Sequence, residues 1–305
     1  MCPACKGDLS VRADEVAAGD IVSGALMCGP CRKTYPVRAG IPRFVDQDAY
    51  AESFGDEWHR FRTVQIDSLN GTTESQDGFR LKTGLIPDDL HGRLVLDAGV
   101  GAGRYSEVMA LWGAEVVGVD LTRAVDAAAQ NLRNYPTAHL VQADIFALPF
   151  RDETFDVAYS IGVLHHTPDT ATAFRHVAAV VKKGGLLAVY VYQAAGLARY
   201  VSDIFRAITT RLPRQVVHYL STAAIPLYFL HRIPVIGRIS QTLLPTNVHP
   251  SWRGRWLDTF DWYTPKYQWK HRYPEVIRWF REAGFSDLYV ADEPICIRGL
   301  KVAAR

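Results

Sequence analysis

Three glycines at alternate positions follow a short apolar run, and together they are the clearest candidate for a ligand site in this sequence. The run Leu94–Ala98 carries a carboxylate, Asp97, near its end and leads directly into Gly99, Gly101 and Gly103. Glycine adopts positive φ and leaves no Cβ in the way of a ligand, so the segment predicts a buried strand, a tight turn and the start of a helix. Because a glycine-rich turn alone fits several ligands, the residues downstream decide which one is meant.

Polar residues follow the next apolar runs at places where an adenosine can be recognised. Asp120, with Leu121 beside it, lies about 20 residues beyond the glycine turn, where a carboxylate accepts hydrogen bonds from both hydroxyls of a ribose. Asp144 follows the next run and can accept from an adenine amine, while Ile145 can meet the ring. Ser160 ends the run after that and is a further candidate for cofactor binding.

Strand-like and helix-like stretches alternate from residue 94 onward. Strands are expected at Leu94–Ala98, Glu115–Val119, His139–Gln142, Phe155–Ser160 and Leu186–Tyr192, with a closing pair at Ser286–Ala291 and Ile295–Ala303. Helices are expected to begin near Arg104, Thr122, Pro168 and Pro274. Alternation of this kind predicts a parallel sheet covered on both faces, with ligands bound at the carboxyl ends of its strands.

This series resembles the class I S-adenosylmethionine-dependent methyltransferases, in particular those of methyltransferase type 11, from about Leu94 to Tyr192. The family's cradle, Asp/Glu-x-Gly-x-Gly-x-Gly, is present, and its spacing differs from the Gly-x-Gly-x-x-Gly of nicotinamide enzymes. The resemblance implies an α/β, Rossmann-like fold with a seven-stranded, mostly parallel sheet. It also implies that S-adenosylmethionine is held by Asp97, Gly99, Gly101, Gly103, Asp120, Leu121, Asp144, Ile145 and Ser160.

Two histidines after the fourth expected strand are candidates for a general base. His165 and His166 stand in the family's Leu-His-His segment, and a neutral imidazole accepts a proton near neutral pH. In related O-methyltransferases a carboxylate near the fifth strand can orient such a histidine, but residues 188–192 contain no acid. Two alternatives therefore stay open. Either ring can be a helix cap or a packing residue, and methyl transfer by alignment and desolvation needs no base.

Four of the five cysteines lie within the first 31 residues, as two Cys-x-x-Cys pairs. In a reducing compartment this pattern indicates a metal site rather than disulfides. Cys2, Cys5, Cys28 and Cys31 can close a tetrahedral Zn²⁺ site, which would contribute on the order of 10–16 kcal/mol to folding. Four thiolates leave no open position, so the expected zinc is structural rather than catalytic.

Residues 1–45, including the segment from Tyr35 to Val45, resemble the zinc-ribbon domain of the Trm112-like family, which also precedes some methyltransferases. Its expected role is a structural one, with substrate contact as the alternative. After it, aromatic residues spaced by three or four between residues 48 and 70 predict a helix with one apolar face, namely Tyr50, Phe54, Trp58 and Phe61. That helix is expected either to cover the cofactor site or to pack against the core.

Residues 193–271 do not fit the alternating pattern and separate the fifth expected strand from the last expected helix. We therefore divide the chain into a zinc ribbon at 1–45, a methyltransferase core at 46–192 and 272–305, and a helical and aromatic insertion at 193–271. The insertion is expected at the edge of the active-site face, where it caps the site and selects the substrate.

Arginine is concentrated in the insertion. The chain has a formal net charge of +2, yet residues 196–255 hold eight arginines, no lysine and one acid, Asp203. Apolar residues from Tyr200 to Leu212 share one helical face, with Arg199, Arg206 and Arg211 nearer the other. The arginines can recognise phosphate or carboxylate, rest on an anionic membrane surface, or be simply solvated.

The segment from Leu257 to His271 is rich in aromatic and hydrogen-bonding side chains and is expected to be a loop that returns to the sheet. Aromatic rings stack on sugars and flat rings, and polar groups orient hydroxyls, so this loop is a candidate substrate wall. The candidate substrate residues are Asp261, Tyr263, Tyr267 and His271. A buried aromatic hinge is the alternative interpretation.

The sequence thus predicts a methyltransferase that acts on a hydroxyl of an anionic small molecule, a glycan or a lipid-linked substrate. One alternative is RNA as the acceptor, and another is a non-catalytic zinc-ribbon activator with a vestigial cofactor pocket. A polar, cysteine-containing start, and uncharged runs such as residues 219–230 that are too short to span a bilayer, favour a cytoplasmic protein over a secreted or membrane-spanning one. A protein partner is not identified by any motif.

Overall fold

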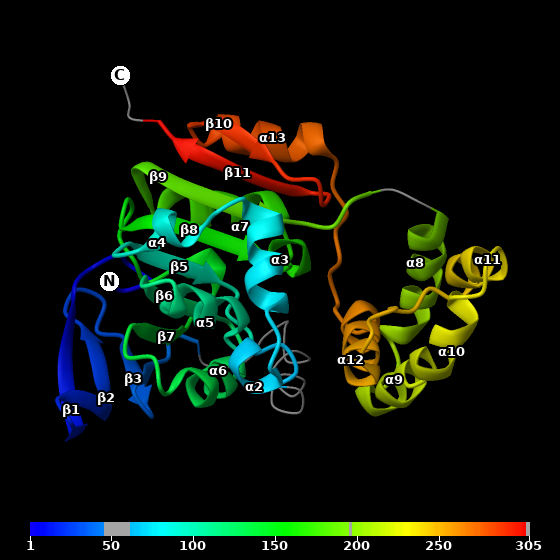
Figure 1. Ribbon diagram of the computed structural model, residues 1–305. Coiled ribbons are helices and arrows are strands. Elements are labelled where there is room, and N and C mark those ends of the chain that lie inside the picture. Colours follow the sequence, from blue (N-terminus) through cyan, green and yellow to red (C-terminus); the bar gives the residue numbers. More distant parts are fainter. Residues whose placement is uncertain (46–61, 195–196, 303–305) are drawn as a thin grey trace. The chain divides into compact units, whose positions relative to one another are not determined.

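The computed structural model describes residues 1–45, 62–194 and 197–302. It consists of two compact units, shown in Figure 1. The first comprises Met1–Tyr192 and Trp269–Arg305, and the second comprises Gln193–Gln268. Trp269, Lys270 and His271 therefore belong to the first unit.

A four-stranded antiparallel sheet forms the N-terminal part of the first unit. Its strands, in spatial order, are β1 (Leu9–Ala17), β2 (Asp20–Cys28), β3 (Thr34–Arg38) and β4 (Ile41–Pro42). Leu9 at the start of β1 pairs with Cys28 at the end of β2. This register brings the turn before β1 and the turn after β2, which hold the two cysteine pairs, to the same end of the sheet.

A seven-stranded sheet forms the centre of the first unit and confirms the expected fold class. Its order is β10-β11-β9-β8-β5-β6-β7. The strands are β5 (Leu94–Ala98), β6 (Glu115–Asp120), β7 (Ala138–Gln142), β8 (Phe155–Ile161), β9 (Val181–Tyr190), β10 (Phe285–Val290) and β11 (Cys296–Lys301). Only β11 runs antiparallel to its neighbours. The expected strands are all present, with ends that differ by a few residues.

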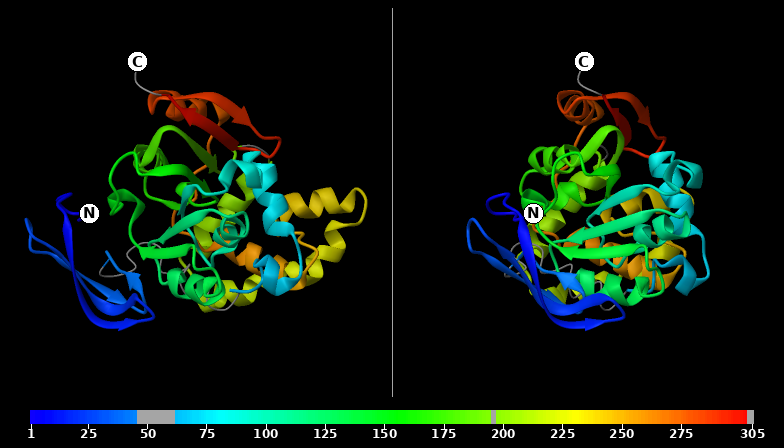
Figure 2. Two further views of the ribbon diagram at one scale, coloured as in Figure 1. Left: turned by 60° about the vertical axis from the view of Figure 1, so that its left-hand side comes forward. Right: turned by 90° about the vertical axis from the view of Figure 1, so that its left-hand side faces the viewer.

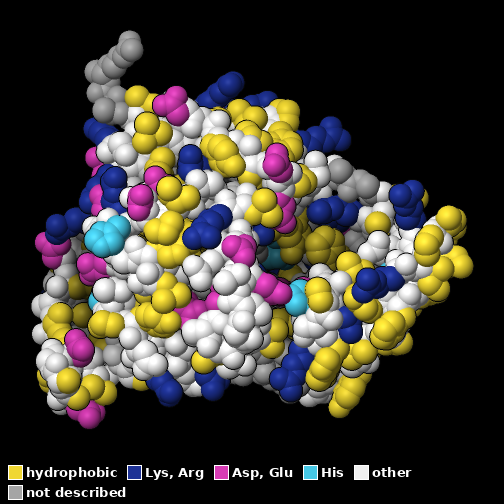
Figure 3. Space-filling view, viewed as in Figure 1, with side chains coloured by type: hydrophobic (Ala, Val, Ile, Leu, Met, Phe, Trp, Pro, Cys, Tyr) yellow, Lys and Arg dark blue, Asp and Glu magenta, His cyan; other side chains and the backbone are white. Residues whose placement is uncertain are grey.

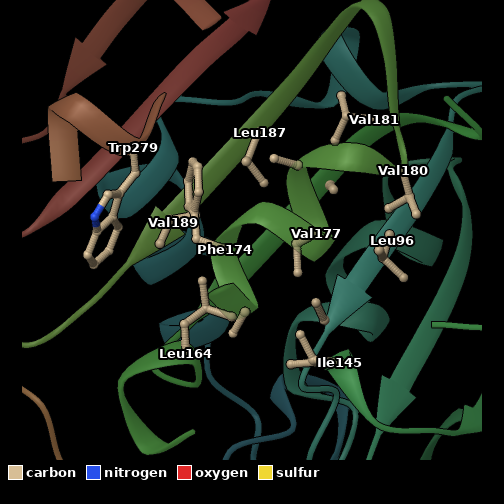
Figure 4. Packing of buried hydrophobic residues seen from close by; sticks show 14 of the residues in the cluster. Leu96, Ile145, Leu164, Phe174, Val177, Val180, Val181, Leu187, Val189 and Trp279 are labelled. Atoms are coloured by element: carbon tan, nitrogen blue, oxygen red, sulfur yellow. The ribbon is translucent and has the colours of Figure 1, made fainter. Parts of the chain in front are cut away.

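Apolar residues on both faces of each central strand bind helices to both sides of the sheet. Leu96 belongs to the cluster with α7 (Thr170–Ala179) and α13 (Tyr273–Glu282), and its neighbour Val95 belongs to the cluster with α3 (Glu74–Thr83) and α5 (Arg104–Leu111). This alternation follows from the period of two in a strand. Figure 4 shows the first cluster, in which Phe174 and Val177 of α7 pack near Leu187 and Val189.

Further helices are present among the described residues of the first unit. They are α2 (Asp67–Asn70), α4 (Pro87–Leu90), α6 (Ala124–Leu132) and the 3₁₀ turns η1 (Ile145–Ala147) and η2 (Leu164–His166). The helices expected near residues 104, 122, 168 and 274 begin within two residues of those positions. Most of the helix expected over residues 48–70, with all four of its aromatic residues, lies outside the described residues.

Strand β9 starts five residues earlier than the expected Leu186. Residues 182–185 do not follow the regular pairing with β8, whose partner changes from Val181 at Phe155 to Leu186 at Val157. Gly184 has a φ of +75°, which only glycine adopts readily. Residues 182–185 are therefore an irregularity inside a long strand.

The four-stranded sheet joins the seven-stranded sheet at the β7 edge, as the two views of Figure 2 show. Phe44 donates its backbone N–H to the carbonyl of Gln142, and Arg43 forms a parallel bridge with the same residue. The Arg43 guanidinium also bonds the Gln142 side chain at 2.9 Å and Asp126 at 2.6 Å. The N-terminal sheet is thus anchored to the central sheet by backbone and side-chain bonds.

The second unit is helical in its described residues. It contains α8 (Leu197–Thr209), α9 (Arg214–Ser221), α10 (Ala224–His231), α11 (Ile236–Leu243) and α12 (Trp252–Tyr263). The expectation of a loop from residue 257 onward is wrong for its first half, because α12 continues to Tyr263. Leu257, Phe260 and Tyr263 are buried at helical spacing, and this packing stabilises the helix.

Helix α8 orients its side chains contrary to the usual pattern. Tyr200, Ile204 and Ile208 are exposed, whereas Arg206 is buried and bonds the carbonyls of Trp262 and Pro265. Helical spacing identifies the faces of α8 but not which face the unit buries.

Among the described residues, no helix is both long and apolar enough to cross a membrane.

Candidate functional site

The turn after β5 has the left-handed backbone expected of its glycines. Gly99, Gly101 and Gly103 have φ angles of +106°, +51° and +92°. The N–H groups of Gly99 and Val100 both donate to the carbonyl of Val119 at the end of β6. A Cβ on Gly99 would overlap the side chain of Val163, so the turn and the segment after β8 can approach only because this residue is glycine.

Asp97 lies beneath this turn and is almost fully buried. Its Oδ2 accepts a hydrogen bond of 2.7 Å from the Ser106 hydroxyl. Burial raises the pKa of Asp97 to about 7, because the charged carboxylate loses its hydration, and the negative charge of Asp120 acts in the same direction. The Ser106 bond favours the charged form but does not offset the burial. Asp97 therefore changes its charge close to neutral pH.

Asp120 ties the turn after β5 to the turn after β6. Its Oδ2 accepts from the Gly101 backbone N–H at 3.0 Å, and its Oδ1 accepts from the backbone and hydroxyl of Thr122 at 2.9 Å and 2.8 Å. A carboxylate oxygen accepts up to two hydrogen bonds, and these three bonds fix the orientation of the Asp120 carboxylate. The structure thus places a fixed carboxylate beside the glycine turn, where the sequence predicts the ribose-binding acid.

Asp144 caps the 3₁₀ turn η1 by accepting the N–H of Phe146 at 2.9 Å. Ile145 is buried in the cluster beneath it. Leu121 is held from the same edge, because the Gln142 side chain donates to its carbonyl at 3.1 Å. These residues follow β6 and β7, which pair in parallel, so the structure brings them to the same edge of the sheet as Asp120.

Ser160 contacts the neighbouring strand of the sheet. It is fully buried, and its hydroxyl donates to the carbonyl of Ala98 at 2.7 Å. This bond holds β8 against the end of β5, just before the glycine turn. The geometry assigns Ser160 a bracing position.

His165 and His166 form the 3₁₀ turn η2 that follows β8. His165 is fully buried, and its ring lies 3.8 Å from that of Tyr192 between centroids. Its carbonyl accepts the backbone N–H of Trp269 at 2.9 Å. The ring of His166 is partly exposed and lies 4.2 Å from that of His165. Sequence reasoning noted that residues 188–192 lack an acid but missed that Tyr192 would stack on His165.

The four expected substrate residues do not lie in one loop. Asp261 and Tyr263 belong to α12 and Tyr267 follows it, all in the second unit. The Tyr263 hydroxyl donates to the carbonyl of Pro245 at 2.6 Å, and burial raises its pKa. His271 lies in the first unit, where Glu275 and Thr170 bond its two ring nitrogens at 3.0 Å and 3.1 Å. These bonds fix the start of α13.

The second unit contains a cavity of about 200 Å³. Its walls combine a cation, a carboxylate, aromatic rings and amide or hydroxyl groups, with Arg199, Asn247, Asp258, Thr259, Trp262 and Tyr263 among the lining residues. The Arg199 guanidinium lies 5.5 Å from the ring of Trp262. Only Tyr263 of the expected substrate residues lines this cavity.

The four N-terminal cysteines converge as expected from their spacing. Their Sγ atoms all lie within 4.8 Å of one another, with Cys2 and Cys31 3.6 Å apart and Cys5 and Cys28 3.4 Å apart. Zn–S bonds of about 2.3 Å in a tetrahedron put sulfur atoms roughly 3.8 Å apart. The donor set therefore fits a Cys₄ metal site. The Tyr35 hydroxyl lies 3.2 Å from Cys2 Sγ and forms an outer contact to it.

Sequence reasoning missed a contact between this cysteine cluster and the segment after η1. The Met1 ammonium donates to the carbonyl of Pro149 at 2.8 Å, and the Lys6 ammonium donates to that of Leu148 at 3.2 Å. Both carbonyls follow the turn that Asp144 caps. The cysteine turns and the expected adenine-binding segment are therefore mechanically connected. No local pattern signals a contact between residues so far apart in the sequence.

Two family models match the chain. A model described as a methyltransferase domain matches residues 96–189, and one described as Trm112p-like protein matches residues 1–40. The first range runs from β5 to β9, and the second contains the four cysteines. Both matches agree with the resemblances stated from the sequence.

Curated proteins with similar sequences are methyltransferases by name. Malonyl-[acyl-carrier protein] O-methyltransferase of Pseudescherichia vulneris is 35% identical over 118 residues, 39% of this chain and 46% of that protein. Demethylmenaquinone methyltransferase of Corynebacterium kroppenstedtii is 39% identical over 127 residues, 40% of this chain and 54% of that protein. The chain spans about half the length of the curated relatives it matches.

A solved structure shares the fold. Magnesium protoporphyrin IX methyltransferase from Synechocystis PCC 6803, solved with bound SAH, superposes with a TM-score of 0.50 at 16% sequence identity. The match covers 83% of this chain and 96% of that one. The first unit thus has the Rossmann-like architecture of methyltransferases.

Replacing Gly99 by alanine is expected to lower the free energy of unfolding of the first unit by about 3 kcal/mol or more. The left-handed backbone costs about 1–2 kcal/mol with a Cβ, and the overlap with Val163 adds to it. Gly92→Ala is the matched control, because Gly92 has a φ of +70° with nothing within 4 Å of an added Cβ. Urea denaturation measures both, and equal losses would contradict the proposed close approach.

Proposed function

Because the chain combines a methyltransferase domain with a Trm112p-like domain, we propose that it transfers the methyl group of S-adenosylmethionine to a hydroxyl of an anionic small molecule, glycan or lipid-linked acceptor. The observation that carries the proposal is the fixed carboxylate of Asp120 beside the left-handed glycine turn. In support, the Pseudescherichia vulneris relative is an O-methyltransferase by name.

The residues at the carboxyl edge of the sheet fit such a donor. The carboxylate of Asp120 would accept the ribose hydroxyls, while Asp144 and Ile145 would meet the adenine. Asp97 would face the amino-acid part of the donor from beneath the glycine turn, where a positive charge favours its carboxylate form. Gly99, Gly101 and Gly103 would let the backbone approach the donor closely, Leu121 would add an apolar contact, and Ser160 would keep this wall in place.

The bound donor supplies an electrophilic methyl group on a sulfonium, and the protein has to align the acceptor with it and exclude water. His165 and His166 are the candidates for taking the acceptor's proton. The stacking of Tyr192 on His165 fixes the orientation of that ring, in place of the carboxylate that other families use. His166, being partly exposed, is the better placed of the two to reach a substrate.

We propose that the second unit, which is rich in arginine, binds the methyl acceptor. The cavity beside Arg199 and Trp262 offers a cation and an aromatic wall, which suit an anionic group next to an apolar or ring-shaped body. Tyr263 lines this cavity, and Asp261 and Tyr267 stay substrate candidates on and after α12. The bonds of both His271 ring nitrogens favour a structural role for that residue.

The cysteine cluster is proposed to bind one structural Zn²⁺, since its sulfur spacing fits a tetrahedral site. Four thiolates agree with a reducing compartment, and hence with the expected cytoplasmic setting. The metal would hold the turns that carry Met1 and Lys6, and through them the segment after Asp144. A Trm112p-like domain also agrees with the alternative of an RNA acceptor, which methyl transfer to transfer RNA tests.

Calorimetry with S-adenosylmethionine and S-adenosylhomocysteine is expected to show one donor site per chain. Asp120→Ala should weaken donor binding by about 10- to 100-fold, because it removes hydrogen bonds to a charged group. Asp88→Ala, an exposed acid of α4, is the control and should bind as the unchanged protein does. If the unchanged protein binds neither compound, the enzyme proposal fails and the activator alternative replaces it.

The same preparations then identify the acceptor class with tritium-labelled donor. Transfer to a phenolic acid or a uronic acid supports the proposal, whereas transfer to transfer RNA alone would favour the RNA alternative. His165→Asn and His166→Asn in this assay identify the base. A change in the pH profile of methyl transfer marks the ring that takes the proton, and unchanged rates in both variants exclude this role.

Donor affinity is expected to rise about tenfold between pH 6 and pH 8. Asp97 has a raised pKa of about 7, so it is mostly protonated at pH 6 and mostly charged at pH 8, and the cationic donor favours the charged form. The raised pKa also affects folding. Protonated Asp97 contributes to the free energy of unfolding below about pH 4, and this contribution is lost as the pH rises through about 7. In Asp97→Asn the affinity should not change with pH, and a flat profile in the unchanged protein would refute the assignment.

One zinc ion per chain is expected by atomic absorption, and cobalt in its place should give the absorption of a tetrahedral thiolate site. Cys5→Ser should lower metal retention in a chelator, with a lower temperature of unfolding. Cys296→Ser is the control, because this buried cysteine of β11 lies outside the cluster. Equal metal content in the two variants would argue against the site.

A further inference from the structure

The second unit exposes more apolar surface than the rest of the chain. Of the 27 large hydrophobic side chains exposed among the described residues, 17 belong to this unit, although it has only residues 193–268. Large contiguous apolar patches are uncommon on proteins that stay free in water and mark sites of interaction. Figure 3 shows yellow side chains, with dark-blue ones among them, over the region where α10 and α11 lie in Figure 1.

The exposed side chains form stripes on neighbouring helices. Helix α11 packs against both α8 and α10. On α8 and α11 the exposed apolar residues are spaced by three or four, and Phe229 of α10 and Ile233 after it are exposed as well. We call all of these residues together the apolar surface: Leu197, Tyr200, Ile204, Ile208, Phe229, Ile233, Ile236, Ile239 and Leu243. Because the spacing is helical, each stripe faces outward along its whole helix.

The interior of this unit explains why the stripes can face outward. Arg206 is buried and bonds the carbonyls of Trp262 and Pro265, and Arg255 is buried and bonds those of His249 and Pro250. Arg255 also lies 4.0 Å from the ring of Tyr228. Charged hydrogen bonds thus connect α8 and α12 to the segments beside them, and the apolar stripes are left available for an external partner.

The exposed charges of the second unit are almost all positive. Five arginines are exposed, namely Arg211, Arg214, Arg232, Arg238 and Arg253. The unit has no glutamate, and Asp203 is its only exposed carboxylate. Apolar side chains combined with exposed arginines complement a surface that is apolar inside and anionic outside, which describes a lipid bilayer with acidic headgroups.

We propose that the second unit binds an anionic lipid surface through the apolar surface and its exposed arginines. In this arrangement the helices would lie in the plane of the headgroups, with their apolar stripes towards the acyl chains. Tyr200 would lie at the boundary of lipid and water, where its ring is buried and its hydroxyl stays hydrated. The proposal goes beyond methyl transfer, and it suits an acceptor that is itself lipid-linked.

A second copy of the chain fits the same surface less well. Symmetric pairing through one patch brings the same residues of both copies together. The five arginines of each copy would then face those of the other with only Asp203 to compensate, and like charges across an interface disfavour association. A lipid surface supplies the missing negative charge.

Sedimentation of the full chain with vesicles tests the proposal. Vesicles of phosphatidylcholine with about 30% phosphatidylglycerol should bind at least tenfold more tightly than vesicles of phosphatidylcholine alone, and added salt should weaken the binding. The variant Arg211→Gln/Arg214→Gln should lose about 10- to 25-fold in affinity for anionic vesicles only. The variant Ile204→Ser/Ile239→Ser should bind both kinds of vesicle at least tenfold more weakly.

The control is Val11→Ser/Val16→Ser, which changes two exposed valines of β1 in the first unit and should leave vesicle binding unchanged. Absence of binding to anionic vesicles overturns the proposal. A dimer in ultracentrifugation that Ile204→Ser/Ile239→Ser dissociates, without vesicle binding, would assign the surface to a second copy. Binding to transfer RNA that the arginine variant alone weakens would assign it to RNA.

Donor binding distinguishes this result from the proposed function. The donor residues all belong to the first unit, so the variants of the second unit should bind S-adenosylhomocysteine as the unchanged protein does. Loss of vesicle binding with donor binding intact is a failure of the lipid proposal alone. If the unchanged protein binds vesicles but does not bind S-adenosylhomocysteine, only the proposed function fails.

Discussion

The left-handed turn at Gly99, Gly101 and Gly103 is the constraint on which the carboxyl edge of the central sheet depends. It turns the chain sharply enough that two backbone N–H groups reach the carbonyl of Val119 and a third reaches the carboxylate of Asp120. The missing Cβ of Gly99 makes room for Val163, so the segment after β8 also reaches this edge. Loops from three strands thus meet at this turn, and the approach of the segment after β8 depends on the missing side chain of Gly99.

The N-terminal sheet extends this arrangement to the next loop. Arg43 and Phe44 attach it to Gln142 at the end of β7, and the amide of Gln142 in turn holds the carbonyl of Leu121. On the other side of Asp144, the Met1 ammonium holds the carbonyl of Pro149. The proposed adenine-binding segment is therefore supported at both ends by the small N-terminal domain. The proposed zinc would stabilise that domain and, through it, this segment.

The two units use arginine in different ways. In the first, Arg43 forms an ion pair with Asp126 and joins two sheets. In the second, Arg206 and Arg255 bond backbone carbonyls and replace part of the apolar interior that small helices usually share. Since guanidinium groups have five donors in a fixed plane, one buried arginine can connect several carbonyls. The apolar stripes of α8 and α11 can then face the proposed partner, and the exposed arginines favour a partner with negative charge.

The sequence by itself determined the elements and their order, because strand and helix periods, glycine positions and Cys-x-x-Cys spacing are local. It therefore predicted β5 to β8, the glycine turn, the positions of Asp120 and Asp144, and the cysteine cluster. Only the tertiary structure decided which face of α8 is buried, that α12 continues through Tyr263, that His271 is bonded by α7 and α13, and that Met1 reaches Pro149. The physical reason is that periodicity shows which residues share a face, whereas the partner of that face comes from residues far away in the chain.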